Sequence, residues 1–120
     1  MSRLLIALAL AAAFGLALFA PNARAHQSSN AYLQIDAGER EVSVRWDIAL
    51  RDLDVAIGLD ANDDGQLTWG EVKAAWPRIQ AYALPRLSIA GCPLRASGTT
   101  TALERRSDGA YAVLQLAAEC

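Results

Sequence analysis

The segment DANDDGQLTWGE, residues 60–71, begins with an aspartate, ends with a glutamate and has a glycine at its sixth position. Oxygen-bearing side chains recur at every second residue through Asp60, Asn62 and Asp64. Gly65 then permits a sharp bend that a Cβ would oppose. Because apolar stretches of helical composition flank the segment, it predicts two helices joined by a tight loop.

The oxygen spacing in this loop favours a calcium ion, which takes six to eight oxygen ligands. It matches the spacing of an EF-hand, in which loop positions 1, 3, 5, 7 and 12 supply the ligands. Position 7 uses its backbone carbonyl, and the acid at position 12 uses both carboxylate oxygens. The predicted ligands are therefore Asp60, Asn62, Asp64, Gln66 and Glu71.

The alternative is an acidic turn that only caps the helix beginning near Trp69. Four negative side chains lie within the twelve residues, and without a cation they repel one another and weaken the fold. With three coordinating carboxylates, we expect an affinity of roughly micromolar to submillimolar. The sequence has no second loop of this pattern, and a lone EF-hand is more typical of a structural clamp, or of part of a dimer, than of a switch that opens a groove. The four acidic residues are Asp60, Asp63, Asp64 and Glu71.

The first 25 residues have the features of a secretory signal. Arg3 precedes a long apolar run, and Ala23-Arg24-Ala25 supplies the small-x-small pattern of a cleavage site. We expect cleavage before His26, leaving residues 26–120 as a single domain in the periplasm or outside the cell. The alternative is an uncleaved membrane anchor, since the apolar run is almost long enough to span a bilayer.

The charge of the predicted mature chain argues against nucleic-acid binding. Removing Arg3 and Arg24 from the 11 basic residues leaves nine, against 13 acidic ones, so the formal charge changes from −2 to −4. No basic patch remains to attract phosphates. Residues 26–120 also contain no apolar run of the 18 or so residues that a transmembrane helix needs.

Cys92 and Cys120 are the only cysteines. In an exported chain, two thiols are more often joined than free, so we expect a disulfide bond between them. Its loop is long enough for the bond to contribute about 3.5 kcal/mol in the chain-entropy model.

The rest of the chain predicts an α+β domain with a small antiparallel sheet packed against one helix-loop-helix. Alternating apolar and polar residues indicate strands, and 3.6-residue periodicity indicates helices. We expect Asp47 to cap the first helix and Pro77 to kink or break the second. The expected elements are a hairpin over 31–37 and 41–48, helices over 49–59 and 68–84, and strands over 86–91, 100–106 and 110–119.

Other candidate sites are weaker. His26, as the mature amino terminus, has an amine and an imidazole that could chelate copper or nickel, but no second histidine exists. Asp47, Asp52 and Asp54 are more simply explained as residues that cap and solvate the first helix than as catalytic acids. With no nucleophile motif and no phosphate-binding loop, the sequence favours a domain that is not an enzyme.

Three stretches resemble the amino-terminal exported region of HupE/UreJ-type membrane proteins. The resemblance implies an accessory role for hydrogenase or urease, with nickel or cobalt transport proposed for some members of the family. Such proteins normally continue into several transmembrane helices, whereas this sequence stops at Cys120. The alternative function is thus an accessory or sensing domain of such a transporter without its membrane part, or one with a membrane-embedded partner. The stretches are VRWDIALRDLDVAIGLDANDDGQLTWGEV (44–72), IQAYALPRLSI (79–89) and SDGAYAVLQLAAEC (107–120).

Overall fold

The computed structural model describes residues 3, 5–6 and 29–120. The predicted signal, apart from Arg3, Leu5 and Ile6, lies outside the described residues, and so does His26. No described helix is both long and apolar enough to cross a bilayer.

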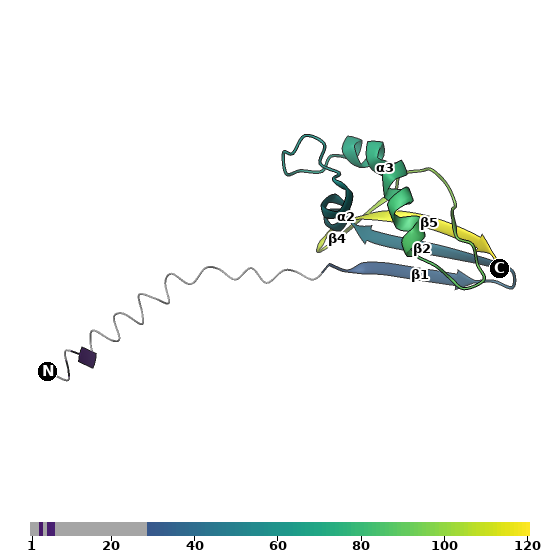
Figure 1. The fold of residues 1–120 in the computed structure, drawn as a ribbon, viewed down its shortest axis with the longest axis horizontal. Helices are drawn as coiled ribbons and strands as arrows, with labels where there is room; N and C mark the ends of the chain where they lie inside the picture. The colour runs from purple at the N-terminus through teal and green to yellow at the C-terminus, as the bar shows by residue number, and fades with distance from the viewer. Residues whose placement is uncertain (1–2, 4, 7–28) are drawn as a thin grey trace.

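Five antiparallel strands form one sheet, with β1, β2 and β5 as its long members (Figure 1). The strand order is β1-β2-β5-β3, and β4 also pairs with β5, along a different part of that strand. The hairpin predicted over 31–48 is confirmed, because β1 and β2 pair along their lengths. The strands are β1 (Ala31–Ala37), β2 (Glu41–Ala49), β3 (Arg95–Ala96), β4 (Leu103–Arg106) and β5 (Gly109–Glu119).

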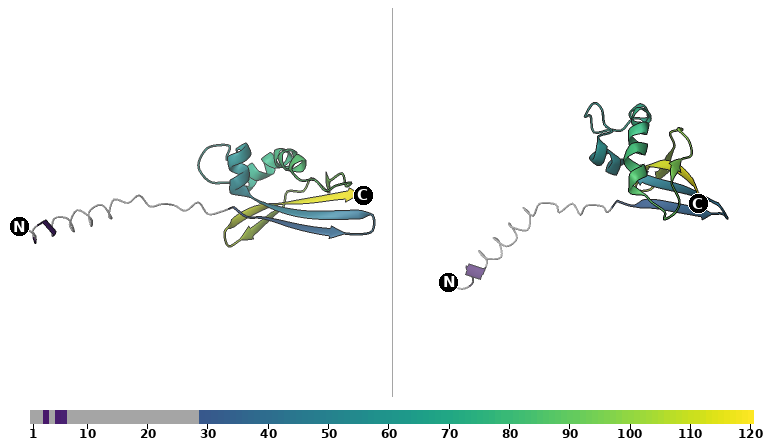
Figure 2. Two further views of the ribbon diagram at one scale, coloured as in Figure 1. Left: turned by 60° about the horizontal axis from the view of Figure 1, so that its bottom comes forward. Right: turned by 45° about the vertical axis from the view of Figure 1, so that its right-hand side comes forward.

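The helices α2 (Leu50–Ile57) and α3 (Trp69–Ala83) lie on one face of this sheet (Figure 2). Alternate side chains of β2 and β5 point toward them, as the two-residue period of a strand requires. The expected α+β architecture is therefore correct. The core residues include Val44, Ile48, Leu53, Val72, Trp76, Ile79, Leu114 and Leu116.

The junction between β2 and α2 differs from the prediction. The strand continues through Ala49, which is itself the N-cap of α2 and makes no side-chain capping bond. Asp47 is buried within β2 and does not cap the helix. Val55, an apolar residue of α2, is 90% exposed.

α3 begins where the sequence predicts, but it does not break at Pro77. Thr68 is the N-cap, and its side chain accepts a hydrogen bond from the backbone of Glu71, while the Glu71 side chain accepts one from the Thr68 backbone. This reciprocal capping box fixes the first turn. Pro77 lies inside one continuous helix, which a 3₁₀ turn, η1 (Leu84–Arg86), prolongs.

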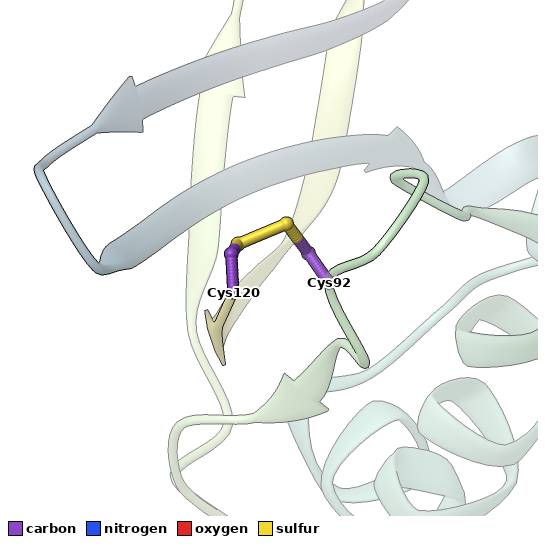
Figure 3. The surroundings of a disulfide bond; sticks show 2 residues. All are labelled: Cys92 and Cys120. Atoms are coloured by element: carbon purple, nitrogen blue, oxygen red, sulfur yellow. A yellow bond between two sulfur atoms is a disulfide. The ribbon is translucent and has the colours of Figure 1, made fainter.

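The prediction of a strand over residues 86–91 is wrong. η1 takes up the beginning of this segment, and Ile89 and Cys92 form an isolated bridge around a tight turn. Gly91 in that turn has φ 76°, a conformation that favours glycine. The segment leads the chain from α3 back to β5, where Cys92 forms the predicted disulfide bond with Cys120 (Figure 3).

Candidate metal centre

The candidate loop leaves α2 through a glycine turn. Gly58 has φ 65°, and its N–H donates to the carbonyl oxygen of Asp54 at 2.8 Å. The Asp54 carboxylate then accepts hydrogen bonds from the backbone N–H groups of Leu59 (2.7 Å) and Asp60 (2.9 Å). Since Leu59 is buried in the core, the backbone at the first predicted ligand is held from two sides.

Arg78 connects the two helices at the same point. Its guanidinium, which extends from α3, donates to the carbonyl oxygens of Ile57 (2.8 Å) and Gly58 (3.0 Å) at the end of α2. These carbonyls belong to the last turn of a helix, where a positive charge is favourable. The start of the loop is thus fastened to α3, the helix that also carries Glu71.

The bend of the loop is built around the Asp60 carboxylate. Its two oxygens accept hydrogen bonds from the backbone N–H groups of Asp64 (3.3 Å) and Gly65 (2.7 Å). Asp63 and Gly65 have φ values of 56° and 78°. No atom lies within 4 Å of the place where a Cβ of residue 65 would be, so the backbone conformation, and not space, requires this glycine.

The next two predicted ligands lie in the same turn. The Asn62 amide accepts from the Asp64 N–H at 3.2 Å and donates to the Asp64 carboxylate at 3.3 Å. Asp64 in turn accepts from the Gln66 N–H at 2.9 Å. Gln66 therefore belongs to the same hydrogen-bonded ring, through its backbone.

Glu71 closes the loop from the first turn of α3. One of its oxygens accepts from the Ala61 N–H at 3.0 Å, and the other accepts from the Thr68 N–H at 2.9 Å. Hydrogen bonds from the backbone and side chain of Thr68, and then from the backbone of Ala61 and Asn62, lower the pKa of Glu71 below its ordinary value. Glu71 is thus held in its ionised form, which is the form that a cation needs.

The structure gathers the five predicted ligands into one loop, and the donor set is chemically uniform. All the atoms that would contact a metal ion are hard oxygens of carboxylate, amide or peptide groups. Such oxygens suit calcium and not the softer transition metals. In the described part of the chain, no three His, Cys, Asp or Glu side chains form a ready-made metal cage. The carboxylates of Asp60, Asp64 and Glu71 instead accept backbone N–H groups.

Sequence reasoning missed Asp54 and Arg78, the two residues that support the loop from outside. Asp54 resembled one more solvated acid on a short helix. Arg78 is 20 residues from Gly58, and nothing in its neighbours indicates the contact. A weak signal existed for Asp54, since an acid four residues before a helix-ending glycine can reach the amides that follow.

A second polar cluster lies on the face of the sheet opposite the helices. Asp47, only 1% exposed, accepts two hydrogen bonds from Arg45 (2.9 and 3.1 Å) and one from Arg106 (2.6 Å). The Arg106 guanidinium also lies 3.9 Å from the centre of the Tyr32 ring. Burial favours a raised pKa for Asp47, but the hydrogen bonds from the two arginines outweigh it and lower the pKa.

No protein-family model, curated protein or solved structure matches the chain. The geometry of the loop and the physical chemistry of its side chains therefore carry the functional argument.

Proposed function

We propose that loop 60–71 binds one calcium ion and that the domain acts as an exported calcium-binding module, not as an enzyme. Asp60, Asn62 and Asp64 would supply side-chain oxygens, Gln66 its backbone carbonyl and Glu71 both carboxylate oxygens. Thr68 is the ninth loop residue, a position that often coordinates through a water.

The observation that carries this proposal is the position of Glu71. The last predicted ligand comes from α3, yet its carboxylate is hydrogen-bonded to the N–H of Ala61, directly after the first ligand. The two ends of a twelve-residue loop are thus adjacent, as a single shared ion requires. An acidic turn that only capped α3 would need the bonds between Thr68 and Glu71, but not the one to Ala61.

The expected role of the ion is structural. A cation bound by residues on both sides of the loop joins the end of α2 to the start of α3, and it removes the repulsion among the four acidic side chains. Ligands that bind only the folded state stabilise it, by about 2.7 kcal/mol at 100 times the dissociation constant. A domain of this size gains substantially from such a contribution.

Isothermal titration calorimetry with calcium tests the proposal. We expect one ion per chain with a dissociation constant on the order of micromolar to submillimolar, and loss of this binding in Glu71→Gln. Asp63→Asn is the matched control, because it removes the same charge from the same loop at a position without a ligand role. If Asp63→Asn weakened binding as much as Glu71→Gln, or if the wild-type protein bound no calcium, the proposal would be wrong.

The proposed location outside the cytoplasm is supported by the disulfide bond, which is rare in reducing compartments. The resemblance to HupE/UreJ-type exported regions supports the same location and remains a proposal. A metal-delivery role would require His26 to bind nickel or cobalt. Titration with nickel, alongside calcium, separates that role from the one proposed here.

A further inference from the structure

β1 forms an open edge of the sheet. It pairs with β2 on one side only, and all seven of its residues are exposed. Leu33 and Ile35 are 47% and 48% exposed on the helix-bearing side of the strand. Nothing in the described part of the chain covers them, and their only charged neighbour within the strand is Asp36.

The opposite edge of the sheet is protected in the ways that natural edge strands usually are. β3 has two residues and β4 has four, three of which are charged: Glu104, Arg105 and Arg106. Short length and charge discourage pairing with another chain. β1 has seven residues, of which only Asp36 is charged, and it contains no proline, lysine or bulge. A long, apolar, uninterrupted edge is a template for another strand.

The backbone hydrogen bonds show which groups of β1 remain available. Gly38 donates to the carbonyl of Glu41 at 2.7 Å, so its amide points to the β2 side of the strand. Because backbone groups alternate between the two sides, the residues two, four and six positions before Gly38 also direct their amides toward β2. The backbone groups of the other β1 residues therefore point to the open edge. These residues are Ala31, Leu33, Ile35 and Ala37.

We propose that β1 pairs antiparallel with β1 of a second copy of this chain, around a two-fold axis at Gln34, so that two sheets join into one. In this register Leu33 lies opposite Ile35 of the second copy, and Gln34 lies opposite itself. It is the register that uses all seven residues, and it pairs every backbone group that points to the open edge. A two-fold interface must be self-complementary, and the sequence AYLQIDA meets that condition.

Charge complementarity favours a second copy over an unrelated strand. Tyr32 lies opposite Asp36 of the other copy, on the face of the sheet that carries Arg106. The Arg106 guanidinium lies over the Tyr32 ring, and the Arg106 side chain is 32% exposed, so its positive charge can be approached from outside. Each Asp36 carboxylate therefore approaches a positive group, and the contact occurs twice. Opposite charges across neighbouring strands stabilise a pair, whereas like charges destabilise it.

A contact through one strand belongs to the small class of interfaces, below about 1,200 Å² in total, so the dimer should depend on concentration. Sedimentation velocity of the purified protein over a concentration series measures this. Carrying it out with a chelator makes the result independent of the proposed calcium site. We expect Ile35→Lys to weaken association at least tenfold without lowering the unfolding temperature. Val55→Lys, which alters an apolar residue on α2 that is even more exposed than Ile35, should have no effect.

Cysteine cross-linking tests the register. Directly opposed residues of the kind expected at Gln34 have Cα atoms about 4.5 Å apart, which suits a disulfide bond. Gln34→Cys should therefore give an oxidised dimer, whereas Asp36→Cys should not, because its two copies are four residues out of register, about 13 Å apart. A protein that stays monomeric at all concentrations, or dimers insensitive to Ile35→Lys and not cross-linked at position 34, would overturn the proposal.

Discussion

Asp47 is the only buried charged residue among the residues that the structure describes, and its environment explains why the fold accepts it. An isolated buried carboxylate would be strongly unfavourable, but Arg45 and Arg106 supply three hydrogen bonds to it. Arg106 comes from β4, 59 residues further along the chain. Asp47 therefore ties the β4–β5 hairpin to the middle of the sheet.

Asp47→Asn should lower the free energy of unfolding at pH 7 by about 2 kcal/mol, since it removes charge-assisted hydrogen bonds. The loss should stay near this value because both arginines are about one-third exposed and water can solvate them in the variant. Urea denaturation measures the change. Asp36→Asn, an exposed position, should change stability by less than about 0.5 kcal/mol.

The pH dependence distinguishes an ion pair from a simple packing effect. The pKa of Asp47 is lower in the folded state than in the unfolded chain, so its charge contributes stability above the unfolded pKa. That contribution is lost as the pH falls through the folded pKa. The stability of wild-type protein and of Asp47→Asn should thus converge as the pH falls below about 4. A difference that stayed constant down to pH 3 would contradict the ion-pair account.

At the scale of the elements, the sequence predicted what local chemistry determines. The loop spacing placed the start of α3, and alternation placed the β1–β2 hairpin. The errors arose where contacts between residues far apart in the sequence determine the structure. Asp47 looked like a helix cap because Arg106 cannot be recognised from its neighbours, and segment 86–91 alternates like a strand but has no neighbouring strand with which to pair along its length.

The candidate site shows the same contrast between features set by local sequence and features set by distant contacts. The predicted ligands are set by spacing alone, and the structure brings their residues into one hydrogen-bonded loop. Their support from Arg78 depends on how α2 packs against α3, so no local pattern predicts it, whereas Asp54 left the weak signal of an acid four residues before a helix-ending glycine. The open edge of β1 was also unpredictable, because an alternating pattern does not indicate which strand lies at the border of a sheet.

The disulfide bond contributes at this scale too, by tying the segment after η1 to the end of β5. Cys92 and Cys120 are 28 residues apart in sequence, and replacing both by serine should lower the free energy of unfolding by about 3.5 kcal/mol. The comparison is made by urea denaturation. Reductant should destabilise the wild-type protein by a similar amount and leave the double variant unchanged. A difference below about 1 kcal/mol would show that the bond is not a major source of stability.

At the scale of the whole molecule, the two proposed activities occupy separate regions. Loop 60–71 projects from the helical layer beside α2 and α3, while β1 borders the sheet on the far side of β2 (Figure 1). A second copy paired along β1 would therefore leave both loops accessible. The sheet in between provides the rigid support, because β2 and β5 pair along nearly their whole lengths.

The central claim is that the oxygens of loop 60–71 surround one calcium ion, and a crystal structure of the protein grown with calcium tests it most directly. We expect one strong peak within the loop, about 2.3–2.6 Å from oxygens of Asp60, Asn62, Asp64, Gln66 and Glu71. Both carboxylate oxygens of Glu71 should contact it. Electron density for water alone between Asp60 and Glu71, at millimolar calcium, would contradict the account.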